Sequence, residues 1–78
     1  MTNNLPADIA AEVRAEISRQ RKPQREIADL LGLSQQQVSE RVLGAVEWRI
    51  SELVRVADWL SVPITKFVPA DESVAGAA

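Results

Sequence analysis

Four polar residues recur with helical spacing in the stretch SQQQVSERVL: Gln35, Gln36, Ser39 and Glu40. Residues one, four and five positions apart share one broad face of an α-helix. A glutamine amide both donates and accepts, so Gln35 and Gln36 could each pair with N6 and N7 of adenine. Ser39 could bond a base or a phosphate, and Glu40 could accept from cytosine N4. The alternative is a solvated polar face, with Glu40 paired to the neighbouring arginine.

The composition removes most catalytic chemistry, because the 78 residues include no cysteine and no histidine. Disulfide scaffolds, thiolate nucleophiles, zinc fingers and imidazole acid–base catalysis are therefore excluded. Asp8, Glu12 and Glu16 follow helical spacing, but no nucleophile accompanies them, and such a row is usually a solvated face. We expect no enzyme activity, no metal, no cofactor and no small-molecule substrate.

Length and hydropathy indicate one small domain of 8.6 kDa, with 46% hydrophobic and 26% charged residues. No run approaches the roughly 18–20 apolar residues of a membrane span, and the start MTNNLPAD lacks the features of a signal peptide. We expect a cytoplasmic location and no membrane partner. The net charge of −2 argues against nucleic acid as a partner, unless the positive charges are clustered.

Such a cluster occurs in RQRKPQR, where Arg19, Arg21, Lys22 and Arg25 have no acid among them. These side chains could clamp phosphates, and each phosphate that they neutralise would release counterions and make binding depend on salt. The alternative is a solvated helix end, where cations favour the C-terminal dipole.

The spacing of apolar residues predicts an all-α fold with five short helices. We expect a flexible arm at 1–5, a folded domain at 6–68, and a flexible tail at 69–78 that could be the linker stub of a longer protein. The predicted helices lie at 6–20, 24–31, 35–43, about 50–60, and shortly after Pro63. Ser34 and Gln37 form the pattern of a capping box at the start of the third. Pro23 cannot cap the second with its side chain.

The fourth predicted helix carries the most regular apolar stripe, formed by residues 50, 53, 54, 57 and 60. This stripe leaves Val56 and Trp59 off its centre. Together with Phe67 they could form a surface for self-association. The alternatives are that Trp59 covers the edge of a small core, and that Phe67 closes the bottom of that core.

The spacing Ile27-Ala28-x-x-Leu31-Gly32-Leu33-x(4)-Val38 predicts two short helices that cross steeply, with the small Ala28 allowing close approach. With Gln24, Ser34, Ser39 and Gly44, this pattern resembles the helix-turn-helix domain of phage repressor and Cro proteins, the lambda-repressor-like (XRE-like) family. The resemblance covers residues 9–68.

The resemblance implies that 35–43 is a recognition helix and that Gln24 contacts a phosphate. One departure is the end of that helix, where Arg41 and Val42 stand in place of the usual hydrophobic residue and Glu. Val42 lies four residues after Val38 and could take over the inward packing. Arg41 would then be free to reach a phosphate or a base, the alternative being a surface ion pair.

The leading hypothesis is a sequence-specific transcriptional regulator that binds a double-stranded DNA operator, either a Cro-type protein or the DNA-binding part of an immunity repressor. One short helix reads only a few base pairs, so specificity requires either a homodimer on two half-sites or additional contacts from an arm or a further domain. The alternative is a protein-binding module, such as an antitoxin or adaptor of the same fold.

Overall fold

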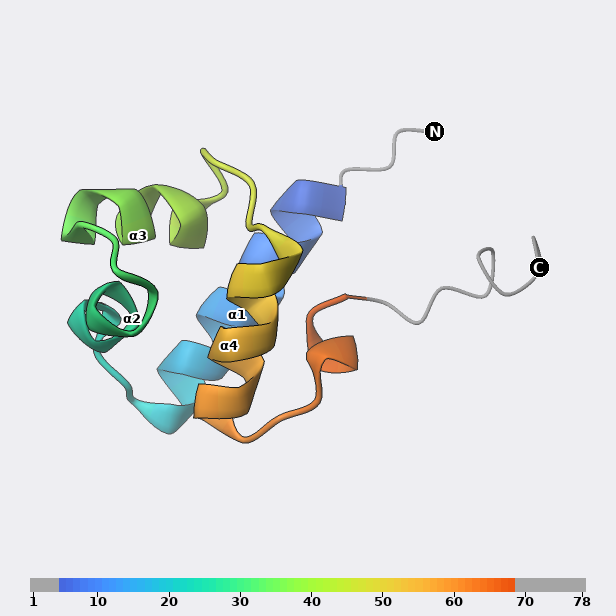
Figure 1. The fold of residues 1–78 in the computed structure, drawn as a ribbon. Helices are drawn as coiled ribbons and strands as arrows, with labels where there is room; N and C mark the ends of the chain where they lie inside the picture. The colour runs from blue at the N-terminus through green and yellow to red at the C-terminus, as the bar shows by residue number, and fades with distance from the viewer. Residues whose placement is uncertain (1–4, 69–78) are drawn as a thin grey trace.

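The computed structural model describes residues 5–68, which form four α-helices and one 3-10 helix (Figure 1). The elements are α1 (Leu5–Gln20), α2 (Gln24–Leu31), α3 (Gln35–Leu43), α4 (Ile50–Leu60) and η1 (Ile64–Lys66). This confirms the predicted all-α class, with a single 3-10 turn as the fifth element. Leu5 is the first residue of α1, so the helix includes the last residue of the predicted arm. The rest of that arm and the predicted tail lie outside the described residues.

The ends of α2 and α3 are set by local chemistry that the sequence predicts. Gly32 and Gly44 end the two helices in the left-handed conformation, with φ of 68° and 88°. The Ser34 hydroxyl accepts from the Gln37 N–H at 3.1 Å, and the Gln37 side chain accepts from the Ser34 N–H at 2.9 Å. The predicted capping box is therefore confirmed. Pro23 precedes α2 without a side-chain capping bond, as expected.

The hydrophobic core lies between the four α-helices and is closed by Phe67, the residue that follows η1. The inward faces of α2 and α3 contribute Ile27, Ala28, Val38 and Val42, which confirms the predicted inward packing of Val42. Figure 1 shows α1 and α4 together in the middle of the molecule, with α2 and α3 beside them at one end. No helix within residues 5–68 has the length and apolar character needed to cross a membrane.

The buried stripe of α4 differs from the predicted one. Val56 is buried in the core together with residues 53, 57 and 60. Ile50 is 61% exposed and Val54 is 49% exposed. Apolar residues at 50, 53, 54, 56, 57 and 60 cover more of the helix than one buried face can hold, so tertiary packing decides which edge faces the core.

The predicted self-association surface is wrong in two of its three residues. Val56 and Phe67 are buried in the core of the monomer and offer no surface to a second copy. Trp59 is half-buried, with the Lys22 ammonium 4.6 Å from the centroid of its ring. The exposed apolar residues of α4 are instead Ile50 and Val54.

Removing the cap of α3 tests its local contribution to stability. We expect Ser34→Ala to lower the free energy of unfolding by about 1 kcal/mol, because the Gln37 N–H loses its acceptor. Urea denaturation measures the change. Ser51→Ala, an exposed serine in the first turn of α4, is the matched control and should alter stability far less. Equal losses in the two variants would contradict the capping role.

Candidate nucleic-acid interface

The predicted base-contacting residues share the outward face of α3. Gln35 and Gln36 are exposed, and Ser39 and Glu40 are half-buried. The opposite face of α3 is fixed in the core through Val38 and its neighbours. Figure 1 shows α3 at the outer edge of the molecule.

The start of α2 offers a second set of polar groups. Gln24 and Arg25 are its first two residues, and both are exposed. The Glu26 N–H already donates to the Pro23 carbonyl at 3.1 Å. The N–H groups of Gln24 and Arg25 have no intrahelical acceptor, and Pro23 provides no side-chain acceptor for them. These N–H groups and the positive end of the helix dipole can therefore receive an anion such as a phosphate. Because α2 packs directly on α3, the two sets belong to neighbouring elements.

The basic cluster that the sequence predicts is divided by the fold. Arg19 forms an ion pair with Glu16, a buried carboxylate that also accepts from Gln20. The Lys22 ammonium donates to the Trp59 carbonyl at 3.3 Å. These two cations already have partners within the domain, whereas Arg21 is exposed between α1 and α2 and stays a candidate for phosphate contact along with Arg25.

The structure corrects the prediction that Arg41 reaches a phosphate or base. Arg41 is only 8% exposed, and its Nε donates to Glu52 Oε1 at 2.9 Å. Its Nη1 also donates to the Gln37 carbonyl at 3.3 Å. Arg41 follows Val38 by three residues, so it lies on the inward side of α3, where the Glu52 carboxylate on α4 receives it. The ion pair that the sequence left as an alternative is formed, but it is buried rather than at the surface.

Glu52 has two structural roles that were not predicted from the sequence pattern. Its Oε1 accepts both from Arg41 and from the backbone N–H of Arg49 at 3.0 Å, at the start of α4. Burial by itself would raise the pKa of Glu52. The hydrogen bonds from Arg41 and Arg49 and the charges of both arginines outweigh burial and hold the pKa below its ordinary value. The carboxylate therefore stays ionised while it joins α3 to α4.

A second arginine fixes the end of α3 from the other side. Arg14 on α1 donates from Nη1 to the Val42 carbonyl at 2.6 Å. Helix C-termini leave carbonyls without intrahelical partners, and a cation there is favoured by the dipole. The role of Glu52 at the start of α4 could have been predicted from the sequence. It is the third residue of the predicted fourth helix, and an acidic residue at that position often caps the start of a helix. Nothing in the sequence pattern marked Arg14.

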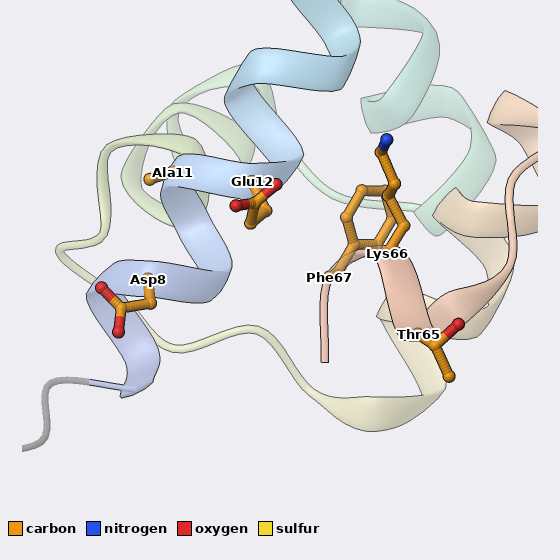
Figure 2. A pocket seen from close by; sticks show the side chains of 6 residues that line it. All are labelled: Asp8, Ala11, Glu12, Thr65, Lys66 and Phe67. Atoms are coloured by element: carbon orange, nitrogen blue, oxygen red, sulfur yellow. The ribbon is translucent and has the colours of Figure 1, made fainter. Parts of the chain in front are cut away.

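A hollow on another part of the surface is separate from this interface. It has a volume of about 320 Å³ and opens between α1 and the segment around η1. Figure 2 shows the carboxylates of Asp8 and Glu12 on one side and Lys66 and Phe67 on the other. None of its lining residues belongs to α2 or α3. It therefore contributes no group to the outward face of α3.

The short crossing helices, the tight turn at Gly32 and the outward α3 define a small helical domain of the helix-turn-helix type. The family model described as the BetR domain matches residues 6–76. The chain therefore belongs to the BetR domain family, a family of small helical, helix-turn-helix-like domains associated with DNA binding. This supports the general class in the resemblance described above. No curated protein matches the chain.

The buried pair predicts a pH-dependent contribution to stability. We expect Glu52→Gln to lower the free energy of unfolding by about 3 kcal/mol at pH 7, because Arg41 keeps a buried charge without its counterion. The folded-state pKa of Glu52 is depressed, so the carboxylate stabilises the fold above its ordinary pKa of 4.5 and loses this effect as the pH falls through the folded-state pKa.

Urea denaturation between pH 7 and pH 2 checks this expectation. The stabilities of the wild type and Glu52→Gln should converge as the pH falls. Glu47→Gln, which alters an exposed carboxylate in the turn before α4, is the control and should stay close to the wild type. A difference between wild type and Glu52→Gln that is constant with pH would show that the charge of Glu52 is not the stabilising feature.

Proposed function

We propose that this BetR domain is a sequence-specific double-stranded DNA-binding transcriptional regulator that reads the major groove with α3. The observation that carries the proposal is the polar outward face of α3, with its glutamines exposed and its opposite face locked in the core. The major groove is wide enough for an α-helix and presents a distinct pattern of donors and acceptors for each base pair. Membership in a helix-turn-helix-like family supports this reading.

In this proposal, Gln35 and Gln36 recognise adenine, and Ser39 and Glu40 extend the same face. Gln24 and Arg25 hold the phosphate backbone from the start of α2, with Arg21 beside them. The backbone contacts position the domain, whereas the contacts to base edges give it specificity. The residues have no catalytic task, and occupation of an operator is enough to exclude polymerase, as a Cro-type protein or immunity repressor would.

Two copies on adjacent half-sites would give the specificity that one helix of nine residues lacks. Ile50 and Val54 favour such pairing, because both are exposed apolar residues one turn apart on α4. The proposal therefore includes a homodimer on an operator with two-fold symmetry.

Selection of bound duplexes from a random pool tests the function directly. We expect enrichment of a short motif arranged as an inverted repeat, and an affinity for it that falls as the salt concentration rises. Affinity measured at several salt concentrations gives the slope. If no motif is enriched at any salt concentration, the DNA-reading function is wrong and the protein-binding alternative takes its place.

Two single substitutions distinguish base reading from backbone binding. We expect Gln36→Ala to weaken binding to the selected site by about 1–3 kcal/mol and to leave binding to random DNA nearly unchanged. Arg25→Ala is the matched contrast: it should weaken both kinds of DNA and reduce the salt slope by about one unit. Equal losses on selected and random duplexes for Gln36→Ala would contradict its role in base reading.

A further inference from the structure

Leu43, the last residue of α3, is 71% exposed. It is the most exposed of the large apolar residues within the described residues 5–68. Its exposure does not come from a loose helix end. The carbonyl of Val42 receives Arg14, and the N–H of Gly44 donates to the Arg41 carbonyl at 3.2 Å. The structure therefore holds a large apolar side chain toward solvent on a fixed part of the backbone.

The position of Leu43 on α3 places it on the proposed reading face. It follows Gln36 by seven residues, Ser39 by four and Glu40 by three, so the four residues have the spacing i, i+3, i+4 and i+7. This spacing describes one face of a helix. The homeodomain recognition helix reads base edges with four residues at this same spacing.

The length of α3 allows all four residues to reach one stretch of groove. Seven residues of α-helix span about 10 Å, which corresponds to about three base pairs of B-DNA. The three polar residues of this face, Gln36, Ser39 and Glu40, are therefore followed at the end of the helix by a side chain that can make no hydrogen bond.

The main apolar feature on the base edges of the major groove is the C5 methyl group of thymine. We propose that Leu43 is a specificity-determining residue that packs against a thymine methyl, at the end of the sequence read by Gln36, Ser39 and Glu40. This inference rests on the proposed function, because it requires α3 to lie in the major groove. It adds an apolar contact to a site otherwise made of hydrogen-bonding groups.

Replacement of thymine by deoxyuridine tests the contact, because it removes the methyl group and keeps the base pair. The probe is the duplex selected from the random pool, with each thymine replaced singly. We expect one replacement to weaken wild-type binding about fourfold, the effect of one buried methyl group. In Leu43→Ala the same replacement should have no effect, whereas Leu43→Met should keep the sensitivity.

Leu5→Ala is the matched control, because it truncates another exposed leucine, which lies on α1 rather than α3. DNA binding by this variant should weaken as much as wild-type binding when the thymine methyl group is removed. Circular dichroism of each variant verifies that the fold is unchanged.

The inference is overturned if wild-type binding is specific but insensitive to every thymine methyl, or if Leu43→Ala retains the same sensitivity as the wild type. Both results would leave the DNA-reading function intact. Failure of the wild type to select any sequence would overturn the proposed function and this inference together.

Discussion

The position of α3 depends on a core that it shares with the other helices. With eight and nine residues, α2 and α3 are too short to be stable as isolated helices in water. Ile27 and Val38 are fully buried at their facing sides, and Leu53 on α4 joins them in the same core. Tertiary burial therefore stabilises both helices and sets their crossing at the same time. Any surface that α3 presents to a partner is determined by what its inner face packs against.

The buried ion pair of Arg41 and Glu52 restricts the rotation of α3 beyond what apolar packing achieves. Replacing such pairs by apolar residues is often neutral or stabilising, so their net contribution to stability is small, whereas removal of one partner is costly. Hydrophobic contact by itself tolerates small rotations of a helix, but a charged hydrogen bond with a fixed acceptor does not. Glu52 is held in turn by the N–H of Arg49, and Arg14 holds the far end of α3 from α1. Arg14 thus connects α3 to α1, and Arg41 connects α3 to α4.

Because several cationic side chains make contacts within the domain, the positive charge available to a partner depends on the fold. In a chain with a net charge of −2, any affinity for a polyanion depends on where cations remain exposed. Arg41 is buried with its carboxylate partner, Arg19 stays exposed but is paired with the carboxylate of Glu16, and Lys22 is held against the ring of Trp59. Arg21 and Arg25 are exposed near the start of α2, where the helix dipole has the same sign. The local field at this end can therefore favour a phosphate despite the acidic total.

The amino-acid sequence by itself determined the all-α class, the approximate bounds of the helices and the local caps, because these follow from spacing and from residue types that act within a few positions. Ser34, Gln37 and Gly32 are examples of such local signals. It also placed the polar side chains on one face of α3. Only the tertiary structure decided that Arg41 turns inward and that Val56, rather than Val54, joins the core. A helix with apolar or amphipathic residues on several sides has more than one edge that could be buried, and the choice depends on partners distant in sequence.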